Sequence, residues 1–224
     1  MEHQTVHLRP FGTSCLSRRY AMLFYTLLLT MVAAPVVAAL ELSGGLVELL
    51  LAASLVAAIA PVSAAVSRRA LLALTGVLWV ARFVFEWFKH SALSAVSLAL
   101  WTVMGLVAAA YALRFAFRAT QVDAEHVYAA LSAYLLAGIF FGSFYWVLEQ
   151  ISPGSFQTNG ALTRVGAIYF SFVSLATLGY GDIVPRTDIA RGLAIVEGVG
   201  GQLFLAVLVA RLVSLYARGK TADE

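Results

Sequence analysis

The sequence has little charge and almost no cysteine. Charged residues make up 12% of the 224 positions, whereas about 25% is typical of a soluble domain. Cys15 is the only cysteine, which excludes an internal disulfide bond and a Cys-x-x-Cys metal site. Hydrophobic residues reach 61%, well above the roughly 45–50% of a soluble domain. We therefore expect a polytopic membrane protein.

The sequence patterns of common enzyme sites are also lacking. The chain has no His-Glu-x-x-His, no phosphate-binding P-loop and no Gly-x-Ser-x-Gly, and its acidic residues are scattered. The net charge of +3 is small, and basic residues gather at the ends of apolar runs. That distribution is typical of membrane topology signals rather than of a nucleic-acid surface. We expect no enzyme activity, no nucleic-acid partner and no cofactor.

Six apolar windows are long enough to cross a membrane, because a hydrocarbon core of about 30 Å requires about 20 helical residues. They cover approximately residues 20–40, 46–66, 70–88, 92–115, 127–148 and 189–216. The sequence therefore predicts an all-α membrane protein with six transmembrane helices.

Basic residues predict the orientation of these spans. If the six spans alternate, one side of the membrane holds Arg9, Arg18, Arg19, Arg68, Arg69, Arg114, Arg118, Arg218 and Lys220. Because Lys and Arg accumulate in cytoplasmic loops, we expect both termini in the cytoplasm. We expect the chain in the plasma membrane, in contact with lipids.

The segment between the last two windows is long and has two parts. Residues 150–160 are rich in turn-forming residues. Residues 161–177 are apolar but too short to cross, and this length predicts a re-entrant helix. Thr158, Asn159 or Thr163 could cap its N-terminus.

The end of this segment, 174-SLATLGYGDIVP-185, is too rich in glycine for the middle of a membrane helix. Non-helical backbone at membrane depth is tolerated where protein buries it or water meets it. In four copies around one axis, its carbonyl oxygens could replace the hydration shell of a monovalent cation. Gly179 and Gly181 reach the positive φ angles that this requires, and Thr177 could add a ring of hydroxyl groups.

The run 169-YFSFVSLATLGYGDIVP-185 closely resembles the potassium-channel signature Thr-x-Gly-Tyr-Gly-Asp with its preceding pore helix and following proline. The resemblance covers about residues 127–216. It implies a homotetrameric, potassium-selective channel that conducts K⁺ passively. The K⁺ sites it implies are formed by Thr177, Leu178, Gly179, Tyr180 and Gly181.

The resemblance also implies that Asp182 supports the filter behind its outer mouth. Two departures from the family pattern concern this aspartate. Tyr169 and Phe170 stand where many relatives have two tryptophans, and Val173 stands where some relatives have an acid. We therefore expect Asp182 to lack a carboxyl partner.

The first four windows occupy the position of a voltage sensor. A sensor needs about 3–4 gating charges per subunit, but the fourth window has no charge before Arg114, so we expect weak voltage dependence. Arg82 and Glu86 have the spacing of a helical pair. His126 could titrate near neutral pH, but a lone histidine at a membrane surface is usually solvated, so its role stays open. The expected domains are a tail at 1–19, a four-helix domain at 20–118, a connector at 119–126, a pore domain at 127–217 and a tail at 218–224.

The last window has three glycines within residues 198–201, where each costs a helix about 1 kcal/mol relative to alanine. Alignment from the filter places Gly201 at the hinge of related inner helices. We expect a gating hinge there, with tight packing against the pore helix as the alternative.

Helical counting from the filter places other residues of this window. It predicts that Gln202, Leu205 and Val209 share a stripe that lines the cavity below the filter. Glu197 should face protein instead, either as a functional acid or in a hydrogen bond to Ser171 or Ser174.

Two other functions remain open for the whole chain. One is a non-selective cation channel, and the other is a non-conducting regulatory or assembly subunit. A secondary transporter is disfavoured, because the sequence shows neither inverted repeats nor broken midplane helices. The sequence indicates no gating stimulus.

Overall fold

The computed structural model describes residues 19–40, 91–118 and 124–222, with isolated positions between 41 and 90. The predicted spans at 46–66 and 70–88, and the Arg82–Glu86 pair, lie outside the described residues. The described elements are α1 (Arg19–Ala39), α4 (Ser91–Phe117), α5 (Ala124–Ile151), β1 (Phe156–Gln157), α6 (Arg164–Leu175), β2 (Val184–Pro185) and α7 (Asp188–Ala222).

Four of these helices are long and apolar enough to cross a membrane, namely α1, α4, α5 and α7. The chain is therefore a mainly helical membrane protein, as its composition predicts. The helix ends lie close to the ends of the predicted windows, except that α7 continues past Tyr216 to Ala222. The helix α5 begins at Ala124, so the last residues of the expected connector form its first turn.

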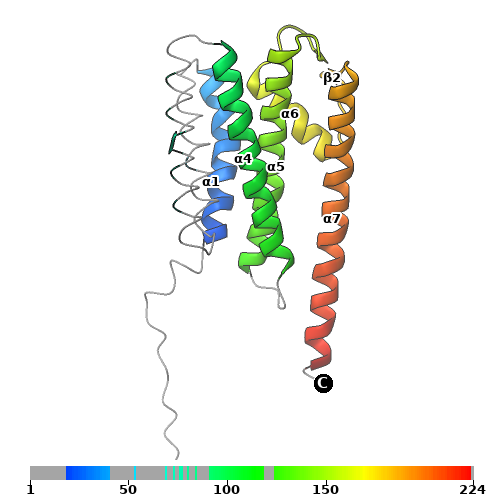
Figure 1. Cartoon of the computed structure of the whole chain (residues 1–224). Helices are drawn as coiled ribbons and strands as arrows, with labels where there is room; N and C mark the ends of the chain where they lie inside the picture. The colour runs from blue at the N-terminus through cyan, green and yellow to red at the C-terminus, as the bar shows by residue number, and fades with distance from the viewer. Residues whose placement is uncertain are drawn as a thin grey trace, which may run out of the picture.

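Helix α5 is the centre of the bundle. It packs against α4 and α1 on one side and against α6 and α7 on the other (Figure 1). Small side chains bring α4 and α5 together, since Ala108 and Ala112 of α4 and Ala129 and Ala133 of α5 are all buried in one core. Close backbone approach through small residues is the usual way in which membrane helices associate.

Contacts between helix termini stabilise one end of this bundle. Glu125, in the first turn of α5, accepts a hydrogen bond from the backbone N–H of Tyr20 at 2.9 Å. The Tyr20 ring stacks on Phe115 near the end of α4, with 4.7 Å between centroids. Phe115 also stacks on His126 at 4.6 Å, so His126 packs against an aromatic ring. These contacts place the start of α1, the end of α4 and the start of α5 together.

The opposite end of α5 leads into a small feature that the sequence analysis missed. Strands β1 and β2 pair antiparallel, with Phe156 opposite Pro185 and Gln157 opposite Val184. Glu149 at the end of α5 holds the same loop by accepting the N–H groups of Gly154 at 2.8 Å and Phe156 at 3.0 Å. The chain therefore leaves α5, passes through α6 and returns to the same end of the bundle before α7 starts (Figure 1).

Candidate functional site

The short helix α6 has a defined start. Thr163 is its N-cap residue, with φ −88° and ψ 161°. The Thr163 hydroxyl accepts a hydrogen bond from the backbone N–H of Gly166 at 3.0 Å, which satisfies one of the free donors in the first turn. Of the three capping candidates in the sequence, the structure selects Thr163.

Two glycines of α5 allow α6 to pack closely against α5. A Cβ atom added at Gly142 would lie 2.4 Å from the Cα atom of Ile168, and one added at Gly138 would lie 2.5 Å from the Phe172 ring. Both distances are far below van der Waals contact, so each position requires glycine at this spacing of the helices. Sequence reasoning did not identify these two residues, although a small residue every fourth position is a known signal for close helix packing.

The end of α6 is a Schellman motif. The backbone N–H of Leu178 donates to the carbonyl of Val173 at 2.9 Å, and the N–H of Thr177 donates to the carbonyl of Ser174 at 3.1 Å. These are the two bonds that define the motif, and they place Thr177 at the position that glycine usually occupies. Thr177 accordingly has φ +56°. A β-branched residue in this region is strained, so the surrounding bonds must hold it there.

The left-handed conformation recurs at every second residue after this cap. Gly179 has φ +60° and Gly181 has φ +79°, as the requirement for positive φ predicts. Thr177, Gly179 and Gly181 are the positive-φ residues of this stretch. Residues with a left-handed backbone conformation alternate with residues of negative φ, so the orientation of successive peptide groups changes in a repeating pattern. It leaves Leu178 and Tyr180 to carry the intervening side chains.

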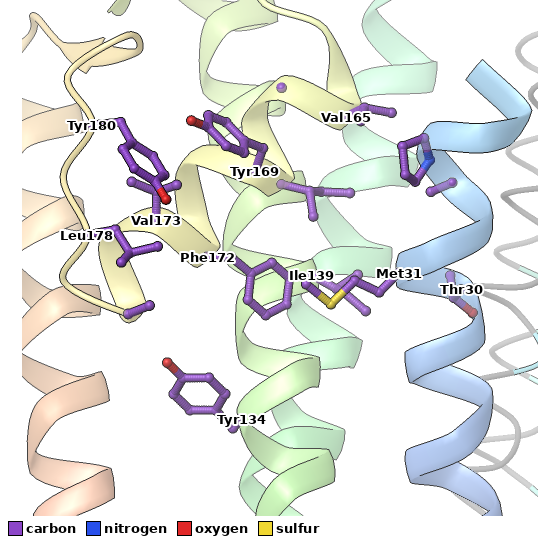
Figure 2. A pocket seen from close by; sticks show the side chains of 15 residues that line it. Thr30, Met31, Tyr134, Ile139, Val165, Tyr169, Phe172, Val173, Leu178 and Tyr180 are labelled. Carbon is purple, nitrogen blue, oxygen red and sulfur yellow. The ribbon is translucent and has the colours of Figure 1, made fainter. Parts of the chain in front are cut away.

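These two side chains point back toward α6 (Figure 2). The ring of Tyr180 lies parallel to that of Tyr169, with 6.4 Å between centroids and 4° between planes. Leu178 and Tyr180 are nevertheless 56% and 66% exposed in the single chain. The segment therefore has two apolar side chains that one protomer covers only in part.

Asp182 follows the segment and interacts with the hydroxyl group of Tyr169. Desolvation, followed by the influence of Asp182, raises the pKa of Tyr169 above its usual value. Val173, at the position where some relatives have an acid, is buried. The group that senses Asp182 electrostatically in this chain is therefore a phenol.

An apolar cavity of about 710 Å³ lies beside this segment (Figure 2). Its walls come from α1, α5, α6 and the segment after α6, and include Met31, Ile139, Phe172, Leu178 and Tyr180.

Helix α7 contacts the end of α6 through one face. A Cβ atom added at Gly201 would lie 2.8 Å from the Leu175 Cδ2 atom and 3.1 Å from the Leu175 carbonyl oxygen. Gly201 is therefore in close contact with α6, as the packing alternative predicts. Gln202, Leu205 and Val209 are exposed in the single chain, so the structure places them away from α6.

Glu197 lies on the face of α7 that meets α6 and is only 2% exposed. Its carboxyl group is hydrogen bonded to Ser171, which confirms one of the two expected partners. Its second partner, the Tyr145 hydroxyl of α5, was not predicted, because nothing in the pattern of α5 distinguishes this tyrosine from the others.

The fold and this site define a helical membrane protein with a two-helix module. In that module, a capped short helix and a glycine-rich segment connect α5 to α7. Residues 129–218 of the chain match the family model described as "Ion channel". The module therefore matches an ion-channel domain, which agrees with the resemblance to the potassium-channel superfamily over α5–α7.

Several curated proteins are similar to this part of the chain. "Two pore potassium channel c" of Oryza sativa subsp. japonica is 36% identical over 91 residues, which are 40% of this chain and 18% of the relative. "Two-pore potassium channel 4" of Arabidopsis thaliana is 47% identical over 60 residues, 26% of this chain and 21% of the relative. "Inward rectifier potassium channel Kirbac3.1" of Paramagnetospirillum magnetotacticum is 33% identical over 72 residues, 32% of this chain and 22% of the relative.

The chain thus spans about a fifth of the length of the curated relatives it matches. The relatives are named as channels, which agrees with the expectation that the chain is not an enzyme. No solved structure gives a significant match.

Proposed function

We propose that the chain forms a homotetrameric, potassium-selective channel, in which K⁺ passes through rings of carbonyl oxygens from residues 177–181. The observation that carries this proposal is the left-handed backbone at Thr177, Gly179 and Gly181, directly after a capped helix. Carbonyl oxygens that face one axis in four copies replace the hydration shell of K⁺. In this proposal Leu178 and Tyr180 contribute carbonyls to the axis while their side chains pack behind it.

What one protomer leaves uncovered supports the proposed tetramer. Unpaired backbone groups do not face lipid at membrane depth, because each unsatisfied group costs several kcal/mol. Residues 176–182 are exposed in the single chain, so further copies must enclose them. Only 11% of the most apolar window of α7 is buried, and this leaves α7 free to meet the neighbouring subunits.

The proposed topology makes α6 and the filter re-entrant. With 12 residues, α6 is about 18 Å long at about 1.5 Å per residue, which is short of the roughly 30 Å hydrocarbon core. The β1–β2 pairing returns the chain to the end from which it came. The start of α1 and the end of α7 lie at the opposite end of the bundle (Figure 1), where the charge bias predicts cytoplasm.

The gate is proposed at the inner part of α7. Gln202, Leu205 and Val209 line the cavity below the filter, and Gly201 allows the lower half of the helix to move. The close contact of Gly201 with Leu175 supports a packing role at the same position. The four-helix domain supplies little voltage sensitivity, since α4 carries Arg114 in its last turn and no other charge.

Reconstitution in liposomes tests the proposed function. We expect a protein that elutes as a tetramer to carry strong K⁺ flux and weak Na⁺ flux, with block by Ba²⁺. Equal Na⁺ flux would overturn selectivity and favour a non-selective cation channel. A stable tetramer without flux would overturn conduction and favour a regulatory or assembly subunit.

A further inference from the structure

Three helices meet at the carboxyl group of Glu197. The hydroxyl of Tyr145 on α5 donates to Glu197 Oε2 at 2.5 Å, and the hydroxyl of Ser171 on α6 is hydrogen bonded to Glu197 Oε1. The same Ser171 hydroxyl donates to the carbonyl of Gly138 on α5 at 2.7 Å. Tyr145, Ser171 and Glu197 are all buried. This buried network therefore ties α5, α6 and α7 together at one point.

The number of hydrogens available in the network determines whether the Glu197 carboxyl group is charged or neutral. A serine hydroxyl has one hydrogen to donate. When Ser171 donates it to the Gly138 carbonyl, which is an acceptor only, the bond between Ser171 and Glu197 needs its hydrogen from the carboxyl group. Tyr145 donates to the other carboxyl oxygen. All bonds are satisfied together when Glu197 is the uncharged acid, in the order Tyr145 to Glu197 to Ser171 to Gly138.

The surroundings of Glu197 also disfavour a charge. In the described part of the chain no basic side chain contacts it. The titratable side chain bonded to it is the phenol of Tyr145, and the phenol of Tyr134 is also within its electrostatic influence. A carboxylate buried without a cation is costly, whereas a hydrogen-bonded neutral acid is not. Glu197 is thus a neutral connector between helices.

The network acts on the turn that leads into the filter. Next to Glu197 on α7, a Cβ at Gly198 would lie 3.7 Å from the Ser174 carbonyl oxygen, and Gly201 approaches Leu175. The Ser174 carbonyl is also the acceptor for the N–H of Thr177. A shift of α7 relative to α6 would therefore displace Thr177, the first residue of the proposed filter.

We propose that Glu197, as an uncharged acid, is a positioning residue that holds α7 against α6 and thereby fixes Thr177 at the inner end of the filter. The inference rests on the proposed function in one respect, namely that residues 177–181 conduct. It adds a residue that never meets the ion but keeps the filter and the inner helix in register.

The test compares Glu197→Gln with Glu197→Ala in single-channel recordings from planar bilayers. A glutamine donates its N–H to Ser171 and accepts from Tyr145, so E197Q keeps every bond of the neutral network and should have the mean open time of the wild type. Alanine removes both bonds, and we expect its mean open time to fall about tenfold, the size expected for one to two buried hydrogen bonds. Tyr145→Phe removes one bond and should give an intermediate, roughly threefold fall.

Two outcomes would overturn the proposal. If E197Q is as impaired as E197A, a charged carboxylate is required and the neutral network is wrong. If E197A is a tetramer with wild-type open times, Glu197 does not position the filter. Should E197A not assemble, the comparison of Tyr145→Phe with E197Q decides the second point.

A spectroscopic measurement separates this inference from the proposed function. The infrared difference spectrum of wild type minus E197Q should contain the carbonyl stretch of a protonated carboxylic acid at neutral pH. Its absence would overturn the neutral acid. This band does not depend on ion flux, so a channel that proves non-conducting would refute the proposed function while the state of Glu197 is still measured.

Discussion

The backbone N–H of Leu178 donates a hydrogen bond to the carbonyl oxygen of Val173 at 2.9 Å. This bond closes the C-terminus of α6 and at the same time fixes the start of the glycine-rich segment. Both side chains also line the same apolar cavity. The helix and the glycine-rich segment are therefore one unit, and if this segment is the proposed filter, changes in either should affect conduction.

Substitution of Gly179 by alanine should remove K⁺ flux without loss of the tetramer. An added Cβ at Gly179 would meet no described atom within 4 Å, so steric space within the protomer is not the obstacle. The obstacle is φ +60°, which costs a residue with a Cβ about 1–2 kcal/mol and would turn carbonyls away from the axis. We expect at least a tenfold decrease in K⁺ flux from liposomes.

Gly192→Ala is the matched control for that substitution. Gly192 lies in α7, and its added Cβ also meets no described atom within 4 Å. Alanine is favoured over glycine in a helix by about 1 kcal/mol, so flux should be unchanged and stability equal or higher. Equal flux from the two variants would contradict the role assigned to Gly179.

Thr163→Ala should lower the thermal stability of the assembled channel. The substitution removes the hydroxyl that accepts the Gly166 N–H, and loss of an N-cap costs about 1 kcal/mol. Thr163→Ser keeps the acceptor and should behave as wild type. The melting temperature measured by tryptophan fluorescence checks this, and an unchanged value for Thr163→Ala would show that the cap is not needed.

The pair Gly201→Ala and Gly200→Ala distinguishes packing from a hinge. The methyl group at Gly201 would meet Leu175 at 2.8 Å, whereas at Gly200 it meets no described atom within 4 Å. Overpacking costs about 1–3 kcal/mol, so Gly201→Ala should lower the melting temperature and Gly200→Ala should not.

The double variant Gly201→Ala with Leu175→Ala completes this comparison. Removal of the Leu175 side chain relieves the contact at Cδ2, so stability should be partly recovered relative to Leu175→Ala alone. If Gly201 is also a hinge, open probability should stay reduced in the double variant. Wild-type open probability in every Gly201 variant would eliminate the hinge.

The conductance of the channel should depend only weakly on voltage. Each gating charge that crosses the membrane contributes about 2.3 kcal/mol per 100 mV, and the described part of α4 has no charge before Arg114. Macroscopic currents between strongly negative and strongly positive potentials should therefore give a shallow conductance–voltage curve. A slope equivalent to several elementary charges per channel would contradict this and would point to the residues between α1 and α4.

The sequence by itself determined the class of protein and predicted the place of the proposed pore. Hydrophobic runs of about 20 residues identify α1, α4, α5 and α7, because hydropathy and length are local properties. The requirement for positive φ at Gly179 and Gly181 is local as well, since it follows from the absence of a Cβ atom. Helical counting also placed Glu197 on a protein-facing side, because periodicity is a property of one helix.

Only the tertiary structure decided which groups meet. Tyr145 and Glu197 are 52 residues apart in the chain, and their contact depends on how α5 and α7 both pack against α6. The left-handed Thr177 is a result of the bonds that close α6, and propensity alone predicts the opposite for a β-branched residue. The requirement for glycine at positions 138, 142 and 201 likewise depends on the helix that packs against each of them. Periodicity fixes the face that a residue occupies, but the partner on that face is set by the packing of three helices at once.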